Sequence, residues 1–153
     1  MPGVGALAIL SATATERRCH MSSTDQHTAI VRECFAYATK GDRAGLERIL
    51  SPDFVIHVPE EHRGVDGLLE MVETFRSALP DLAVSVDHQF AVDDYVASRF
   101  TVRGTHEGEL LGAPATGRRV AMSGITVSRC EDGRIAEEWE LVDVTGLLQQ
   151  VAA

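Results

Sequence analysis

Positive charge is scarce in this chain of 153 residues, which contains a single lysine, Lys40, and has a formal net charge of −9. Nucleic acids and anionic membrane surfaces attract basic proteins, so this charge argues against both as partners. Long hydrophobic runs are also missing, and no segment approaches the ~20 apolar residues that cross a bilayer as a helix. With 44% hydrophobic residues the composition is that of an ordinary globular protein, and the length indicates one domain.

Cysteine is rare and follows no ligand pattern. Cys19, Cys34 and Cys130 are odd in number and widely spaced, without a CxxC motif or a Cys/His pairing. This spacing argues against a zinc site and favours reduced thiols. We therefore expect a cytoplasmic protein.

The first 22 residues contain a short apolar patch that imitates a signal peptide. A secretory signal begins with positive charge, whereas Arg17 and Arg18 follow the apolar stretch here. We interpret residues 1–22 as a disordered extension, with a secretory signal as the alternative. The folded domain is predicted to span residues 23–153.

Hydrophobic periodicity divides this domain into a helical half and a β-rich half. Helical spacing recurs over residues 24–40, 42–50 and 65–79, with Ser23 or Thr24 as the first N-cap. A short strand at 54–58 and a polar loop, EEHRG, separate the second and third helices. Alternating patterns then predict strands over 82–90, 95–105, 120–130 and 135–142, a DG hairpin turn before the last strand, and a final helical turn over 145–151.

Helices followed by a run of antiparallel strands are typical of the α+β class. We predict N-terminal helices packed on a curved, mainly antiparallel sheet, which together form a cone with one open end. The interior of such a cone is the natural place for an apolar ligand.

Two segments carry a resemblance to a known family: GTHEGELLGAPATGRRVAMSGITV, which begins at Gly104, and EDGRIAEEWELVDVTGLLQQ, which begins at Glu131. Together with the order of the predicted elements, they resemble the SnoaL-like polyketide cyclases over about residues 24–151. That family belongs to the nuclear-transport-factor-two-like superfamily, with ketosteroid isomerase and limonene epoxide hydrolase as relatives. The resemblance implies the cystatin-like cone of that superfamily.

The resemblance also implies a cofactor-free enzyme that closes a ring by intramolecular aldol condensation of a hydrophobic, polyketide-like small molecule. The general acid/base of the family is a carboxylate, whose place here is taken by Glu140. The histidine that assists this acid falls on Thr126, and a pocket glutamine falls on Gly124. Two polar groups of the family are therefore replaced.

The segment RIAEEWELVDV gathers four carboxylates around the only tryptophan of the chain. Strict alternation groups Trp139 with Ile135 on the more core-like face and puts Glu140 on the other face. The family correspondence requires the reverse, which a β-bulge could produce. We expect Glu140 to face the pocket, where desolvation would raise its pKa, and we interpret Glu137 and Glu138 as surface charges.

Two histidines are further catalytic candidates. His57 closes a short strand near the expected pocket mouth, and His106 lies near the end of a long strand. Either could position or polarise a substrate oxygen, with a structural or exposed role as the alternative. The spacing of His57, His62 and His106 resembles neither HxH nor HExxH, so we predict no metal site.

The predicted substrate pocket combines core-type apolar residues with polar ones. Its members are Phe54, Ile56, Phe75, Arg103, Met122, Thr126, Trp139 and Asp143. Arg103 could meet an anionic or phenolate substrate, or simply face solvent. Asp143 is alternatively the N-cap of the final helical turn.

Three functions remain open. The first is a cofactor-independent cyclase or isomerase of a hydrophobic carbonyl compound. The second is an epoxide hydrolase, for which Arg99 or Arg103 would lie near acids. The third is a non-catalytic small-molecule-binding or dimerisation module, which the two replaced polar groups favour. We also expect a homodimer formed through the outer face of the sheet, around residues 120–127.

Overall fold

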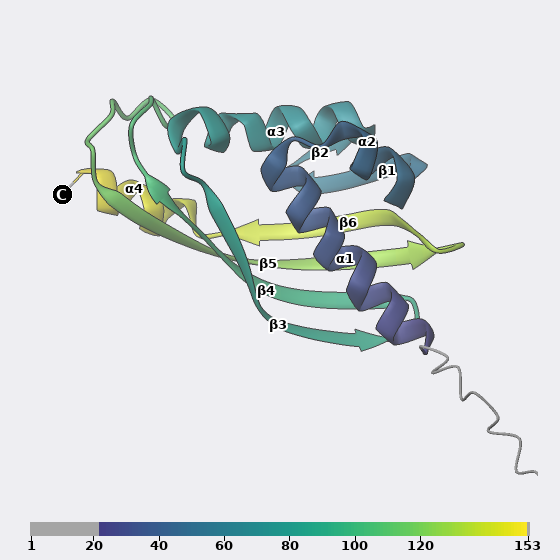
Figure 1. Ribbon diagram of the computed structural model, residues 1–153. Coiled ribbons are helices and arrows are strands. Elements are labelled where there is room, and N and C mark those ends of the chain that lie inside the picture. Colours follow the sequence, from purple (N-terminus) through teal and green to yellow (C-terminus); the bar gives the residue numbers. More distant parts are fainter. Residues whose placement is uncertain (1–21, 153) are drawn as a thin grey trace, which may run out of the picture.

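The computed structural model describes residues 22–152, which form helices packed on a six-stranded sheet (Figure 1). In chain order the elements are α1 (Ser23–Lys40), α2 (Arg43–Ile49), β1 (Leu50–Val58), β2 (Glu60–Arg63), α3 (Gly64–Ala78), β3 (Ala83–Val92), β4 (Tyr95–Thr105), β5 (Arg119–Glu131), β6 (Arg134–Val142) and α4 (Val144–Ala152). The predicted extension over residues 1–22 lies outside the described residues except for Ser22. The predicted domain bounds of 23–153 stay a prediction.

Short polar signals fix where the first two helices begin and end. The N-cap of α1 is Ser22, one residue before the predicted range, and it forms a capping box with Asp25. Gly41 ends α1 in the left-handed conformation (φ 69°), which a glycine adopts without a steric penalty. Asp42 then caps α2 by accepting a hydrogen bond from the Gly45 backbone N–H at 3.0 Å.

The sheet has the strand order β2-β1-β6-β5-β4-β3. Neighbouring strands are antiparallel except for β1 and β6, which run parallel. This mixed sheet with its helices confirms the predicted α+β class. The turn between β5 and β6 has Asp132 and Gly133 at positive φ, as the DG signal predicted.

The strand β2 replaces the predicted polar loop. Its residues pair antiparallel with β1, and His62 lies opposite Ile56. A short, charged strand at a sheet edge is stabilised by backbone pairing rather than by burial of its side chains. It therefore lacks the hydrophobic alternation by which most strands are predicted. The loop prediction was therefore wrong at this point.

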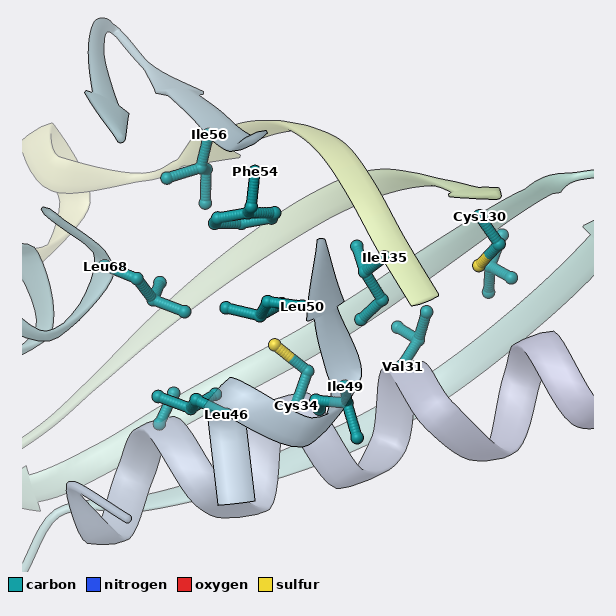
Figure 2. Packing of buried hydrophobic residues seen from close by; sticks show 12 residues of the cluster. Val31, Cys34, Leu46, Ile49, Leu50, Phe54, Ile56, Leu68, Cys130 and Ile135 are labelled. Atoms are coloured by element: carbon teal, nitrogen blue, oxygen red, sulfur yellow. The ribbon is translucent and has the colours of Figure 1, made fainter. Parts of the chain in front are cut away.

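Helices α1 and α3 cover one face of the curved sheet, and α2 lies beside them (Figure 1). Val31 and Cys34 point from α1 into the cluster that contains Leu50 and Ile135 (Figure 2). A second buried cluster extends toward α4 and includes Phe100 and Met122. No helix within residues 22–152 is long and apolar enough to span a membrane.

A β-bulge in β6 decides which side chains of this strand face the helices. Arg129 of β5 pairs with Glu137, but the next residue, Cys130, pairs with Ile135, so Ala136 has no partner on β5. The extra residue reverses the alternation beyond it. Ile135 and Ala136 are both buried, and Glu138 rather than Glu137 then faces inward. The strict alternation that grouped Trp139 with Ile135 was wrong for this reason.

Candidate active site

An apolar cavity of about 320 Å³ lies between the helices and the inner face of the sheet. This volume is at the lower end of the range for small-molecule sites. Phe35 of α1, Phe75 of α3 and Phe100 of β4 line it. The rings of Phe35 and Phe100 lie with centroids 5.0 Å apart and planes tilted by 50°. Aromatic walls of this kind suit a flat, hydrophobic ligand.

Glycine at position 124 makes room for the Phe100 ring. A Cβ built on Gly124 would lie 2.8 Å from Phe100 Cε1 and 2.9 Å from Val142 Cγ1, closer than real side chains approach. The family resemblance places a polar glutamine at this position. In this chain the Phe100 ring occupies that space, so the cavity wall is apolar at this position.

Glu140 lines the cavity from β6, as the family correspondence predicted. Thr126 of β5 lies opposite it in the sheet, and the Thr126 hydroxyl donates a hydrogen bond to Glu140 Oε2 at 2.8 Å. Burial raises the pKa of the Glu140 carboxyl, and this hydrogen bond opposes part of that shift. Thr126, predicted as a pocket residue, is fully buried and acts on the pocket through Glu140.

Glu138 is a second carboxyl in the same cavity, and its assignment as a surface charge was wrong. Its side chain is 5% exposed, and the Ser128 hydroxyl donates a hydrogen bond to its Oε1 at 2.5 Å. Burial, reinforced by the charge of Glu140, raises the pKa of Glu138 to about 8. At neutral pH this carboxyl is therefore mostly protonated.

Cys34 adds a thiol to the cavity wall. Burial raises its pKa well above the ordinary value, and the nearby Glu138 and Glu140 raise it further. A protonated, buried thiol is a poor nucleophile. Cys34 and Cys130 are both free, and Cys19 lies outside the described residues.

His57 and Trp139 lie on the opposite face of the sheet from the cavity. His57 Nε2 lies 3.0 Å from Glu137 Oε1, and the His57 ring stacks on Trp139 with centroids 5.6 Å apart. Neither lines the cavity, so their predicted places in the pocket were wrong. In β1, Ile56 and Val58 face the cavity, and alternation turns His57 outward.

His106 is fully buried away from the cavity lining. Its Nδ1 lies 3.0 Å from Thr116 Oγ1, and its backbone N–H donates to the Arg118 carbonyl oxygen at 2.8 Å. These bonds hold the two sides of the connection between β4 and β5 together. The geometry therefore supports the structural alternative for His106 rather than a catalytic one.

The remaining predicted pocket residues divide between the cavity and other places. Ile56, Phe75 and Met122 line the cavity, as predicted. Phe54 belongs to the buried core instead. Arg103 lies on the outer face, where its Nη1 donates to Ser85 Oγ at 3.0 Å. Asp143 accepts a hydrogen bond from the Gly146 backbone N–H at 2.8 Å, which is the capping role predicted as its alternative.

Sequence reasoning missed Glu138 and the pocket position of His62. His62 lines the cavity from β2, which the sequence had presented as a loop. Glu138 was missed although a signal was available, because it lies two residues from Glu140 on β6 and an inward Glu140 implies an inward Glu138. Within residues 22–152, no group of three or more His, Cys, Asp or Glu side chains is arranged to hold a metal ion.

Known proteins of similar sequence place the chain in a family. The sequence profile of the SnoaL-like polyketide cyclases matches residues 28–151. The chain belongs to the SnoaL-like polyketide cyclase family. Among SnoaL-like relatives, aklanonic acid methyl ester cyclase DnrD of Streptomyces peucetius is 29% identical over 103 residues, which are 67% of this chain and 70% of that protein.

Solved structures share the SnoaL-like fold. AclR, a proposed hydroxylase from Streptomyces galilaeus, is 31% identical, with a TM-score of 0.75 over 85% of this chain and 83% of that one. IdmH, a proposed polyketide cyclase from Streptomyces antibioticus, is 29% identical, with a TM-score of 0.75 over 84% of this chain and 99% of that one. These assignments differ in chemistry, so the reaction must be argued from the site rather than from the fold.

Proposed function

We propose that this protein is a cofactor-independent cyclase that closes a ring of a hydrophobic, polyketide-like carbonyl compound by intramolecular aldol condensation. The observation that carries the proposal is the position of Glu140 in an apolar, aromatic-walled cavity. The chain also belongs to a family named for polyketide cyclases and is similar to a named cyclase, and both facts support the proposal that it is an enzyme.

Glu140 acts as the general base on a carbon-bound proton next to a carbonyl group. Burial raises the pKa of this carboxyl, which makes its ionised form a stronger base than an exposed glutamate. The hydrogen bond from Thr126 keeps one oxygen in place and leaves the other for the substrate. Phe35 and Phe100 hold the substrate folded, so that its donor and acceptor carbons meet.

The other two functions have less support. An epoxide hydrolase needs an arginine beside the catalytic acids, but Arg99 and Arg103 bond to Asp87 and Ser85 on the outer face of the sheet. A binding module needs no ionisable groups in its cavity, whereas two carboxyls with raised pKa values line this one. Perturbed carboxyls in a cavity are typical of catalysis.

The test is turnover of aklanonic acid methyl ester, the substrate in the name of the relative DnrD. The wild type should convert it to a cyclised isomer, detected by chromatography and mass spectrometry. Glu140→Gln should lower kcat by at least 10²-fold, because an amide cannot accept the proton. Glu137→Gln, the same change on the opposite face of β6, is the matched control and should keep wild-type activity.

A wild-type kcat in Glu140→Gln would contradict the role of Glu140 as the general base. Product containing oxygen from labelled water would instead support a hydrolase.

We further propose a cytoplasmic homodimer that pairs through the outer face of the sheet. Ile125, Trp139 and Leu141 are exposed there by 54%, 39% and 80%, which leaves an apolar surface around β5 and β6. Val120 of the predicted contact strand faces inward and does not contribute. Light scattering should give twice the chain mass of 16.6 kDa.

A further inference from the structure

The cavity contains two carboxyls, each of which accepts a hydrogen bond from a hydroxyl group of β5. Glu138 and Glu140 are two residues apart on β6, beyond the bulge, so both point inward. Their partners on β5, Ser128 and Thr126, are also two residues apart, and each hydroxyl donates to one oxygen of the glutamate opposite. Within residues 22–152 no further hydrogen bond holds the second oxygen of either carboxyl, so each has an oxygen free for a ligand.

The pKa values of both carboxyls are raised, with burial as the largest cause. The charge of Glu140 contributes to the shift of Glu138, whose pKa is about 8, so Glu138 holds its proton at neutral pH. The other titratable groups near Glu138 are the thiols of Cys34 on α1 and Cys130 on β5, and His62 lines the same cavity from β2. None of these makes an ion pair with Glu138 among the described residues.

We propose that Glu138 is the general acid of this site and donates its proton to the carbonyl oxygen of the substrate while Glu140 removes the proton from carbon. The inference rests on the proposed cyclase function. Two carboxyls whose environments hold one protonated and one ionised are a recurring acid/base arrangement in enzymes.

The step balances without any further reactant. The C–H bond breaks and its proton moves to Glu140, while the electron pair forms the new C–C bond with the acceptor carbonyl carbon. The π electrons of that C=O bond move to oxygen, which takes the proton of Glu138. The product is an alcohol isomeric with the substrate, and transfer of one proton from Glu140 to Glu138 restores the starting state.

Glu138 supplies what Thr126 cannot. The family resemblance places an assisting histidine at position 126, but a threonine hydroxyl does not titrate near neutral pH and here it already donates to Glu140. Glu138 holds a proton at the neighbouring inward position of the same strand pair. In this chain the proposed acid therefore lies on β6, next to the base.

The kinetic experiment compares Glu138→Gln with the wild type and the control Glu137→Gln on aklanonic acid methyl ester between pH 5 and pH 10. Loss of a general acid should lower kcat by about 10²-fold with little change in KM, because the amide fills the same space without a transferable proton. The wild-type rate should fall above about pH 8, where Glu138 ionises. Glu138→Gln should lose this alkaline limb, while Glu138→Asp should keep the limb and regain part of the rate.

A second measurement needs no substrate. In protein labelled with ¹³C at the glutamate carboxyls, NMR should find one carboxyl that titrates near pH 8 in the wild type and is missing in Glu138→Gln. No carboxyl titrating above pH 6 would overturn the proposal, and so would wild-type kcat and an unchanged alkaline limb in Glu138→Gln. Loss of the alkaline limb in His62→Gln instead would identify His62 as the acid.

The two proposals fail in different ways. A wild type that turns over, is inactivated by Glu140→Gln and is unaffected by Glu138→Gln removes only the role of Glu138. A wild type that cyclises no substrate removes the proposed function, and the proton transfer from Glu138 with it.

Discussion

Glu137 and Glu138 are neighbours in the sequence but lie in opposite surroundings. Glu137 is on the outer face of β6, where His57 and Arg129 hydrogen-bond to it and lower its pKa. Glu138 is on the inner face, where burial raises its pKa to about 8. The same side chain is thus an ordinary surface anion at one position and a buried proton carrier at the next. The face of the strand on which each glutamate lies, rather than the residue type, decides which of these two roles it has.

The largest expected effect is on stability at high pH. Below pH 4.5 Glu138 is protonated in both the folded and the unfolded chain; as the pH rises toward 8 the unfolded chain loses this proton while the folded one keeps it. Wild-type stability should therefore fall relative to Glu138→Gln by about 1.4 kcal/mol for each pH unit in that window. Urea unfolding at pH 5 and pH 8 should find Glu138→Gln the more stable at pH 8. An equal difference at both pH values would contradict a raised pKa.

A smaller loss of stability is expected for a substitution on the inner face of β5 than for the pH effect at Glu138, and almost none for one on its outer face. Gly124→Ala should cost about 1–3 kcal/mol of unfolding free energy, because the added methyl group must displace the buried Phe100 ring and Val142. Ser123→Ala, one residue away on the exposed face, should stay within about 0.5 kcal/mol of the wild type. Thermal unfolding of both variants provides the measurement, and equal losses would mean that the inner face can relax around a new side chain.

A substitution on the outer face of the sheet should change the oligomeric state of the protein rather than its folding. Leu141→Lys places a charge at the most exposed apolar side chain of the sheet, which is 80% exposed. We expect light scattering to change from the dimer mass to the monomer mass at micromolar concentration, because a buried, unpaired charge opposes association. The fold of the monomer, followed by circular dichroism, should be unchanged. A variant that stays dimeric would place the interface elsewhere.

The smallest effect is expected at Glu137 itself, with the sign opposite to that of Glu138. Because the pKa of Glu137 is lowered in the folded state, its ion pairs stabilise the protein above the ordinary pKa of 4.5, and this contribution is lost as the pH falls below it. Glu137→Gln should cost about 0.2–1 kcal/mol at pH 7 and less than that at pH 3. Urea unfolding at these pH values measures the difference, and a gain in stability at pH 7 would contradict it.

Most of the fold could be predicted from sequence because its signals are local. The cap at Asp42, the break at Gly41 and the turn at Asp132 act through their own backbone neighbours, and the structure has each of them in place. The strand β2 was not predicted because its charged and polar residues show no hydrophobic alternation. Its stability comes from pairing with β1, which is a relation between two segments.

The site was less predictable because it depends on which way side chains point. Glu140 was placed correctly through the family correspondence, whereas hydrophobic alternation alone favoured Trp139. His57 was misplaced for the related reason that a strand turns successive residues to opposite faces. Glu138 was misassigned because the inward position expected for Glu140 was not extended to the residue two positions earlier on the same strand. The cavity and the hydrogen bond from Ser128 then identify it as a pocket carboxyl.

The unpaired Ala136 also determines which residues of β6 face the cavity in this chain. Point substitutions in β6 alter what a side chain does, but an insertion or deletion near this residue alters which residues meet the substrate and which meet solvent. A comparison that is wrong by one position would exchange a proton donor for a surface contact while keeping every letter of the strand. A relative without the extra residue would present a different set of β6 side chains to its cavity.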